Sequence, residues 1–341
     1  MIDIKSLYYS ELENFITDNG FPKFRAKQIS DWLNKGVTSF SQMRNIPKNI
    51  IDFLSGSCYI SVANIEKKLV SRYDKTVKYL FCLNDGEYIE SVVMSYHHGY
   101  SICVSTQVGC KMGCTFCATG KSGFSRSLTA SEILAQIEAA QKDLDIRISN
   151  VVLMGMGEPL DNFDNVIRFL KLVSCENGLN IGMRHITLST CGIVPKIYEL
   201  AKYKFALTLS VSLHAPDNET RGKTMPVNNR YPVEQLIKAC RDYFDVTGRR
   251  VSFEYALIDG VNDTEDCALK LAELLKGMNC HVNLIPVNAV DGTGYQKSKA
   301  ERQKAFVEIL SKRGITATIR RTLGSDINAS CGQLRRNTVV K

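Results

Sequence analysis

Three cysteines lie within eight residues, in the segment Cys110-Lys-Met-Gly-Cys114-Thr-Phe-Cys117. Three thiolates at this spacing can bind three corners of an iron–sulfur cube and leave the fourth iron without a protein ligand. A complete set of protein ligands serves structure or electron transfer, whereas an open metal position can bind a substrate. The spacing therefore favours a catalytic [4Fe-4S] cluster on Cys110, Cys114 and Cys117.

Two other uses of these cysteines stay open on spacing alone. A structural zinc site needs a fourth Cys or His nearby, and the nearest histidines, His97 and His98, lie upstream without paired spacing. Cysteines also serve as small buried apolar residues, which is the role we expect for Cys191 and for most of the remaining cysteines. The twelve cysteines are spread along the whole chain, so no disulfide scaffold is expected.

Strand-like and helix-like segments alternate from residue 100 onward, which places the cysteine segment between a strand and a helix. Such alternation predicts parallel strands with crossover helices, in a barrel or a doubly wound sheet. The apolar strand candidates are residues 101–105, 149–154, 184–189, 206–212, 250–256, 281–285 and 315–320. Thr129-Ala-Ser-Glu132 is typical of a capping box that opens a helix running to about Asp143.

The first hundred residues follow a different pattern. Helical spacing predicts helices over residues 6–17, 25–35 and 41–54. Two strand-like runs, 76–83 and 87–94, flank Asn84-Asp85-Gly86, which favours a hairpin turn. We expect three units: a helical accessory domain at 1–56, a β-hairpin extension at 57–99, and a core at 100–341 that includes a C-terminal extension.

Barrel-type folds carry their chemistry just after the strands, at the carboxyl ends. Distinctive polar segments follow four of the predicted strands in this chain. They are Gly155-Met-Gly-Glu-Pro159, Ser189-Thr-Cys-Gly192, Ser212-Leu-His-Ala-Pro216 and Asn288.

Basic residues are concentrated in two regions. Residues 292–341 carry eleven Lys or Arg and three acids, which accounts for the entire net charge of +8. Residues 22–48 carry six basic side chains against Asp31 alone. Such clusters suit a nucleic-acid backbone, because each phosphate contact releases condensed counterions. A solvated helix face would give the same pattern.

The cysteine triplet, with Phe116 just before its last Cys, resembles the signature of the radical S-adenosylmethionine (SAM) superfamily. Within it the chain resembles the RlmN group, the 23S rRNA adenine carbon-2 methyltransferases that also modify tRNA. The motifs that carry this resemblance span nearly the whole chain: Val104-Ser-Thr-Gln-Val-Gly-Cys110, Gly155-Met-Gly-Glu-Pro159, Ser212-Leu-His-Ala-Pro216, His281-Val-Asn-Leu-Ile-Pro286 and Asp326-Ile-Asn-Ala-Ser-Cys-Gly-Gln-Leu334. The resemblance implies an α/β fold, a partial (βα)6 TIM-like barrel with a small N-terminal helical domain.

The same resemblance implies how the cofactor is held. SAM would chelate the open iron of the [4Fe-4S] cluster and be cleaved by one electron to a 5′-deoxyadenosyl radical, with two SAM molecules used per turnover. The positions that match the family's cofactor contacts are Gly157, Glu158, Ser189, Ser212, Leu213, His214 and Asn288.

Three further positions match the family's catalytic residues. Adenine carbon 2 is electron-poor and cannot attack a sulfonium directly, so a covalent relay through the protein is needed. By resemblance, Cys331 carries the methyl group and Cys103 releases the protein–RNA adduct by forming a disulfide. Glu90 falls at the family's general-base position, although sequence alone would make it a strand-surface carboxylate.

The expected partners are 23S rRNA, tRNA and an electron donor of the flavodoxin or ferredoxin type. A monomer is expected. The first residues carry acids where a secretory signal would be basic and apolar, so we expect a cytoplasmic protein without membrane spans.

Two competing functions remain open. One is carbon-8 methylation of adenine, as in the related Cfr enzymes, which share the triplet, Cys103 and Cys331; Pro159 favours the carbon-2 group. The other is a non-catalytic iron–sulfur protein that binds RNA or senses redox state. It would require a fourth protein ligand and would not consume SAM.

Overall fold

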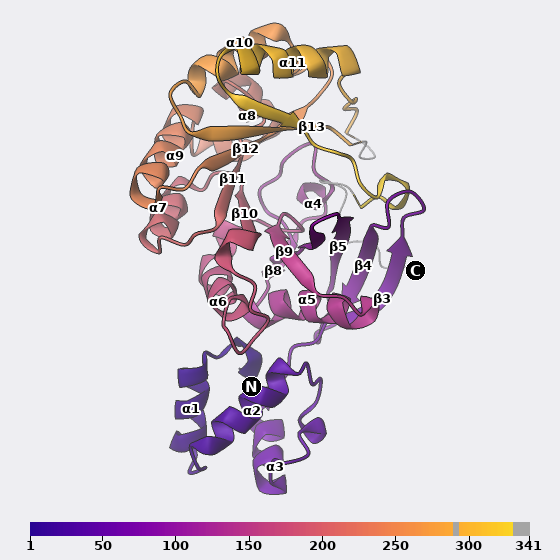
Figure 1. Cartoon of the computed structure of the whole chain (residues 1–341), viewed down its shortest axis with the longest axis vertical. Coiled ribbons are helices and arrows are strands. Elements are labelled where there is room, and N and C mark those ends of the chain that lie inside the picture. Colours follow the sequence, from indigo (N-terminus) through magenta and orange to yellow (C-terminus); the bar gives the residue numbers. More distant parts are fainter. Residues whose placement is uncertain (289–292, 330–341) are drawn as a thin grey trace.

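The computed structural model describes residues 1–288 and 293–329. Its centre is a curved sheet with the strand order β14-β13-β12-β11-β10-β9-β6-β5-β4-β3 (Figure 1). Seven neighbouring strands of this sheet run parallel, in agreement with the seven strands predicted from the sequence. They are β6 (Gly99–Cys103), β9 (Ile148–Leu153), β10 (Ile186–Thr190), β11 (Thr208–Ser212), β12 (Val251–Leu257), β13 (Cys280–Pro286) and β14 (Thr316–Ile319).

Three antiparallel strands extend the sheet beyond β6. These are β3 (Asn64–Val70), β4 (Val77–Cys82) and β5 (Tyr88–Tyr96), with β5 hydrogen-bonded to β6. The β4–β5 hairpin turns at Asn84-Asp85-Gly86 as predicted, because Gly86 adopts a φ of 83° that other residues rarely tolerate. β3 pairs with β4 at the edge of the sheet, where the sequence shows no clear strand pattern. The two outermost strands, β14 and β3, do not pair with one another among the described residues, so the barrel is open.

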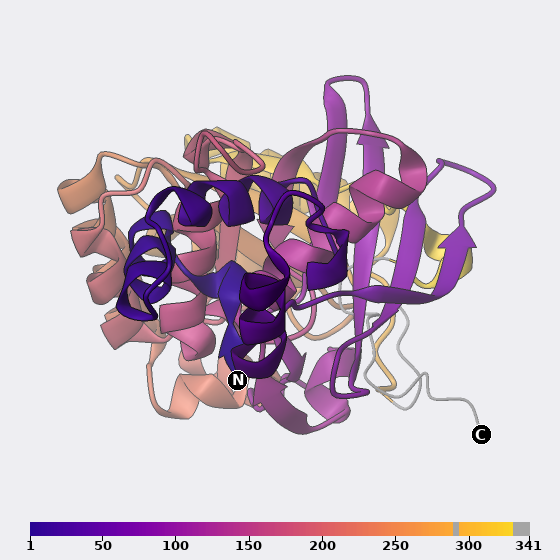
Figure 2. The same ribbon diagram turned by 90° about the horizontal axis from the view of Figure 1, so that it is seen from below.

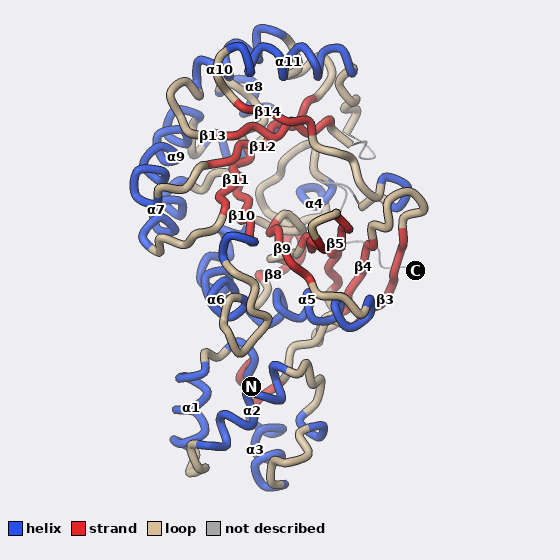
Figure 3. Tube along the Cα trace, in the orientation of Figure 1, coloured by secondary structure: helices blue, strands red, loops and turns tan. Residues whose placement is uncertain are grey.

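Helices cover the outer side of the parallel strands (Figure 3). They are α5 (Ala130–Leu144), α6 (Phe163–Val173), α7 (Val194–Lys202), α8 (Asn218–Thr224), α9 (Val233–Thr247), α10 (Glu265–Leu274) and α11 (Ala300–Lys312). The predicted capping box is present on α5, where the Thr129 side chain accepts from the Glu132 N–H and the Glu132 carboxylate accepts from the Thr129 N–H. The helices bury their apolar faces against the strands in one continuous core.

A small substructure on the inner side of the sheet frames the cysteine segment. β7 (Gln107–Gly109) and β8 (Phe124–Ser127) pair antiparallel, and the one-turn helix α4 (Ala118–Lys121) lies between them in the chain. Neither short strand is evident from sequence periodicity. The pair closes both ends of the cysteine loop against each other and so fixes its position.

The N-terminal helices form a separate unit in front of the core when seen from below (Figure 2). The unit contains α1 (Tyr9–Asp18), α2 (Phe24–Asn34), α3 (Lys48–Ser57) and the short parallel pair β1 (Ile2–Asp3) and β2 (Cys58–Tyr59). Its apolar residues, from Ile4 to Ile60, pack in a core of their own. The third helix begins at Lys48 rather than at residue 41, because residues 40–42 form a 3-10 turn instead.

Polar contacts dock this unit on α5 and α6. Arg168 donates to the Ser6 carbonyl over 3.0 Å and to Glu11, and the Ser131 N–H donates to Ser6 Oγ over 3.1 Å. Lys5 pairs with Glu138 on α5. None of the described helices has the length and apolarity that a membrane crossing requires.

Candidate active site

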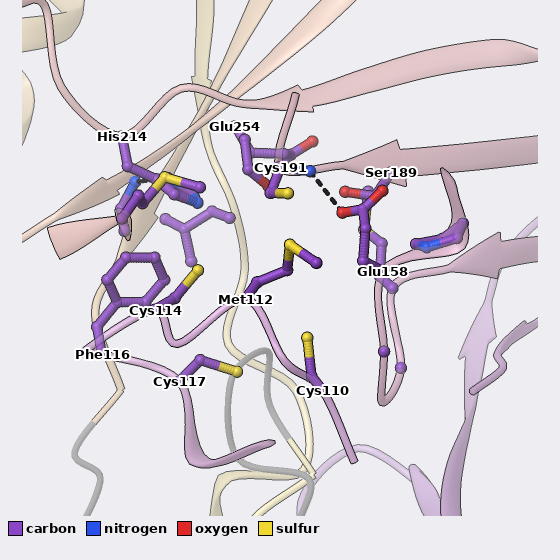
Figure 4. Close-up of a pocket in the computed structure, with 18 of the residues that line it drawn as sticks. Cys110, Met112, Cys114, Phe116, Cys117, Glu158, Ser189, Cys191, His214 and Glu254 are labelled. Carbon is purple, nitrogen blue, oxygen red and sulfur yellow. Dashed lines mark hydrogen bonds between the residues drawn. The ribbon is translucent and has the colours of Figure 1, made fainter. Parts of the chain in front are cut away.

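A cavity opens at the carboxyl ends of the parallel strands, on the side where the cysteine loop lies. Strand residues from β9 to β13 line it together with the loop, as the position of chemistry in barrel folds predicts. Figure 4 shows the thiols of Cys110, Cys114 and Cys117 directed toward a common space in this cavity. The ring of Phe116 packs edge-on against His214 at 4.9 Å between ring centroids.

Burial favours the protonated form of two of these thiols, those of Cys110 and Cys114. It raises the pKa of Cys110 to about 12. Burial, with the neighbouring cysteines, also raises the pKa of Cys114 well above its usual range. Metal coordination deprotonates such thiols outright, so loading the cluster releases protons. In the described part of the chain, no three His, Cys, Asp or Glu side chains are arranged to hold a single metal ion.

Glu158 is buried in the same cavity as the cysteine loop, and two backbone N–H groups donate to its carboxylate. Its Oε2 accepts from the Cys191 N–H over 2.7 Å (Figure 4), and its Oε1 accepts from the Leu160 N–H over 3.0 Å. Burial raises the pKa of Glu158, and these two hydrogen bonds oppose that shift. The carboxylate therefore has a fixed orientation in the cavity wall.

Gly157 is required where the chain passes strand β7. Its φ is 103°, and a Cβ at this position would lie 2.6 Å from the Gln107 side chain. The same Gln107 accepts from the Glu158 N–H over 2.9 Å and donates to Asp161 over 2.8 Å. Strand β7 and the motif after β9 are thus joined by one side chain.

His214 is a buried neutral histidine with a defined tautomer. Its Nδ1 accepts from the Ala256 N–H over 2.9 Å, so the ring proton is on Nε2. Burial, together with the charge of Arg221, lowers the pKa of His214 to about 3. Arg221 is fully buried and donates to the carbonyls of Leu213, Ser212 and Cys191, which ties the ends of β10 and β11 together.

The other sequence-predicted contacts divide into two groups. Ser189, Ser212 and Asn288 line the cavity with Gly157, Glu158 and His214. Leu213 does not, because its side chain points into the apolar core and is fully buried there. Its backbone N–H donates to the Glu254 carbonyl over 3.1 Å, so Leu213 positions its two neighbours.

Two residues of the cavity wall were missed by sequence reasoning. Glu254 lies inside β12, where the pattern predicts only a buried strand; its Oε1 accepts from Ser210 over 2.6 Å and from Asn283 over 2.9 Å. Its buried Oε2 has no hydrogen-bond partner in the described part of the chain. Cys191 also lines the cavity, and burial with the adjacent Glu158 raises the pKa of its thiol well above the usual range. The available signal for Glu254 was a single acidic residue inside an otherwise apolar strand segment, Phe253-Glu254-Tyr255.

A second cavity adjoins the first. The two share the wall residues Met154, Ile285, Asn288 and Arg320. Cys103, at the end of β6, lines the second cavity together with residues of β5 and with Ala329. Cys103 and the cluster cysteines are therefore in adjoining spaces rather than in one.

Glu90 is buried, not on the strand surface as its sequence pattern alone would suggest. Its side chain is 3% exposed, and its Oε1 lies 2.9 Å from Lys78 Nζ. Neither cavity wall includes Glu90. Cys331 is outside the described residues, although Ala329, two positions earlier, lies at the second cavity.

Comparison with known proteins identifies both parts of the chain. Residues 104–272 match the radical SAM superfamily, and residues 2–60 match the ribosomal RNA large subunit methyltransferase N-terminal domain. A probable dual-specificity RNA methyltransferase RlmN from Clostridium tetani is 56% identical over 339 residues, which cover 99% of this chain and 97% of that protein. Its counterpart from Alkaliphilus oremlandii is 56% identical and covers 98% of each chain.

A solved structure agrees with these relatives. The crystal structure of a radical SAM methyltransferase from Sphaerobacter thermophilus superposes with a TM-score of 0.94 at 42% identity, covering 98% of this chain and all of that one. Membership in the superfamily implies a [4Fe-4S] cluster and SAM. The chain belongs to the RlmN family of dual-specificity RNA methyltransferases, within the radical SAM superfamily.

Proposed function

We propose that the protein methylates carbon 2 of one adenine in 23S rRNA, at the peptidyl transferase centre, and of one adenine in the tRNA anticodon loop. The observation that carries this proposal is the pair of adjoining cavities. One is lined by the three cluster cysteines and the strand-end motifs, and the other by Cys103 and the segment that leads to Cys331.

The residues of the first cavity suit a cluster with SAM bound to it. Cys110, Cys114 and Cys117 would hold three irons, and no fourth side chain is needed. Among the described residues, Glu254 Oε2 accepts no hydrogen bond and lies 3.9 Å from the Arg320 guanidinium, so it can accept from a donor of SAM, which offers an ammonium, ribose hydroxyls and an adenine amino group. When bound, the cluster and two SAM molecules per turnover would supply a methyl group and a radical. Gly157, Glu158, Ser189, Ser212, His214 and Asn288 would orient them, with Leu213 contributing backbone only.

Cys331 would carry the methyl group as S-methylcysteine, so that the reactive carbon stays on the protein until it joins the base. Cys103 would then release the product. Its thiolate attacks the Cys331 sulfur, and an S–S bond forms as the bond from that sulfur to the transferred carbon breaks. The electron pair of the broken bond stays on the carbon, which takes up a proton to become the methyl group. The resulting disulfide needs a thiol reductant before the next turnover.

Glu90 would accept the proton that carbon 2 must lose. The proton passes to the carboxylate while the C–H electron pair stays on the ring. The one unpaired electron that radical addition leaves on the ring must also depart, and the oxidised [4Fe-4S] cluster, when bound, would supply the acceptor for it. The positions of Glu90 and Cys103 support a role for both in the same reaction, because both side chains lie on one face of the β4–β5–β6 region.

RNA would reach this site as a flipped or loop adenine, because an adenine within a stack cannot enter a cavity. The basic residues of 22–48 and 292–341 would contact phosphates.

We further propose that the protein acts as a cytoplasmic monomer and receives electrons from a flavodoxin- or ferredoxin-type donor. We also propose that the chain divides functionally into residues 1–56, 57–99 and 100–341.

The test uses anaerobically reconstituted enzyme with rRNA and tRNA substrates, followed by mass spectrometry of nucleosides. We expect 2-methyladenosine from the wild type. Cys331→Ala should still cleave SAM to 5′-deoxyadenosine but methylate no RNA, and Cys103→Ala should accumulate a covalent RNA adduct, visible as a shifted band on a denaturing gel. Detection of 8-methyladenosine, or normal methylation by Cys331→Ala, would refute the proposal.

A further inference from the structure

A lysine is buried next to the proposed base. Lys78 lies on β4 with its side chain 9% exposed, and its Nζ is 2.9 Å from Glu90 Oε1. The same Nζ donates to the carbonyl of Asn328 over 3.1 Å. Lys78 thus contacts both the carboxylate and the chain segment that leads to Cys331, although Asn328 is 250 positions away in the sequence.

The sheet registers place this lysine on the same face as the catalytic groups. Lys78 is opposite Val92 and Val92 is opposite Cys103, and Glu90 is two residues from Val92 on β5. Opposite residues of paired strands, and residues two apart on one strand, point to the same side. Lys78, Glu90 and Cys103 therefore share one face of the sheet, and Val92 and Cys103 on that face line the second cavity.

Packing alone does not account for a lysine here. Burying a charged pair removes both groups from water, and well-packed apolar residues of similar volume are often as stable or more so. On the face that Lys78 shares, its neighbours Leu80 on β4 and Val92 on β5 are buried apolar residues. Stability alone therefore does not explain the Lys78–Glu90 ion pair. The pair does fix the position of the Glu90 carboxylate relative to the Asn328 backbone.

We propose that Lys78 is a positioning residue for the methylation reaction. Its ammonium fixes the orientation of the Glu90 carboxylate and anchors the backbone at Asn328, so that the base and the carrier segment keep one relative geometry. Lys78 itself neither gains nor loses a proton when Glu90 accepts the proton of carbon 2. This inference rests on the proposed function, because it takes Glu90 as the base and Cys331 as the carrier.

The test is a mutant cycle in the full-length reconstituted enzyme, with single-turnover methylation of RNA as the readout. Lys78→Met should slow methylation at least tenfold, while Lys78→Arg, which keeps the charge and the donors, should recover most of the rate. Glu90→Gln should be slow as well. The double variant Lys78→Met/Glu90→Gln should be no slower than Glu90→Gln, because a residue that acts through Glu90 has no further effect once Glu90 is gone.

Lys68→Met is the matched control. Lys68 lies on the adjacent strand β3 and pairs with Asp143 over 2.6 Å, away from Glu90. The Lys68→Met enzyme should methylate RNA at the wild-type rate. The unfolding temperature of each variant shows whether the protein has folded, and the cluster absorbance shows whether it has bound its [4Fe-4S] cluster. If Lys78→Met does not load its cluster, Lys78→Gln takes its place, because glutamine keeps a donor without the charge.

The outcomes separate the two proposals. A wild-type rate for Glu90→Gln would refute the base assignment in the proposed function. A slow Glu90→Gln with a near-normal Lys78→Met or Lys78→Gln would overturn the role of Lys78 and leave the base intact. A double variant far slower than Glu90→Gln, or no recovery in Lys78→Arg, would also overturn it.

Discussion

At the scale of single residues, burial shifts the pKa of several groups that line the site. His214 is neutral because burial and Arg221 lower its pKa to about 3, so its Nε2–H is a permanent donor at neutral pH. Burial likewise raises the pKa of the Cys110 and Cys114 thiols and so favours their protonated form in the absence of metal. The site therefore has a fixed pattern of donors and acceptors rather than one that titrates near pH 7.

Glu254→Gln tests the carboxylate that sequence reasoning missed. Glutamine can keep the contacts to Ser210 and Asn283 through its carbonyl oxygen, but it places an NH2 group where Oε2 stood. Loss of one charge-assisted hydrogen bond should weaken SAM binding roughly tenfold, which corresponds to about 1.5 kcal/mol. Equilibrium dialysis with the reconstituted enzyme measures the affinity. An unchanged affinity in a folded variant would show that Oε2 does not face the ligand.

Cys191→Ala distinguishes a wall residue from a fourth cluster ligand. Because Cys191 lies outside the cysteine loop, after β10, and its backbone N–H is bound to Glu158 in the cavity wall, we expect it to stay a thiol. The variant should keep the [4Fe-4S] absorbance and the change in the electron paramagnetic resonance spectrum that SAM causes at an open iron. Loss of the cluster, or its conversion to a smaller one, would instead support the non-catalytic iron–sulfur alternative.

At the scale of elements, the ends of the parallel strands bring distant segments together. β9, β10, β11, β12 and β13 each contribute wall residues to the first cavity, and the β7–β8 pair holds the cysteine loop against them. Hydrogen bonds from single buried side chains, Gln107 and Arg221, connect these ends. The elements provide the scaffold, and a few polar side chains set its final geometry.

The basic helix α2 offers a test of RNA contact at this scale. Lys23 and Lys27, beside and within α2, have side chains about 70% exposed. Lys23→Glu with Lys27→Glu should weaken RNA binding about tenfold or more and reduce the slope of log affinity against log salt by about 2. Filter binding over a range of salt concentrations measures both.

The matched control for α2 lies on the other side of the core. Lys270→Glu with Lys276→Glu makes the same change of charge on and just after α10, where the two side chains are 54% and 74% exposed. This variant should lose much less affinity. Equal losses in the two variants would mean that only overall charge matters.

At the scale of the whole molecule, two separately packed cores are joined by a small polar interface. The N-terminal helices have their own apolar core, and Arg168 is central to the contact because it bonds Ser6 and Glu11 and covers the Tyr8 ring at 4.4 Å. Polar interfaces of this kind couple the stability of two units only weakly.

Arg168→Met should uncouple the two units. The only tryptophan, Trp32, lies in the N-terminal unit, so its fluorescence reports the unfolding of that unit, whereas circular dichroism reports the whole chain. In the variant the midpoint of the fluorescence transition should move to a lower denaturant concentration, which corresponds to a loss of about 1 kcal/mol in the free energy of unfolding of the N-terminal unit. The main circular dichroism transition should keep its midpoint. Lys196→Met, which breaks the Lys196–Glu199 pair on α7, should leave the two transitions unchanged relative to wild type. A shift of both transitions together in Arg168→Met would argue against separate units.

The sequence by itself determined the parts that depend on near neighbours. Apolar periodicity identified all seven parallel strands, Thr129 and Glu132 identified the start of α5, and Gly86 identified the hairpin turn. Each of these signals is local, since period, cap and turn are properties of a few consecutive residues. The cysteine spacing, likewise a local signal, predicted an iron–sulfur cluster, which membership in the radical SAM superfamily implies.

Only the tertiary structure decided what depends on register and on contacts between distant segments. It paired β7 with β8, turned Leu213 into the core, put Glu254 in the cavity wall, and joined Lys78 to Glu90 and to Asn328. A buried carboxylate and a surface carboxylate on a strand look alike in sequence, because the face on which each side chain lies is set by how strands pair. The motifs specified the chemistry, and strand pairing set where each group acts.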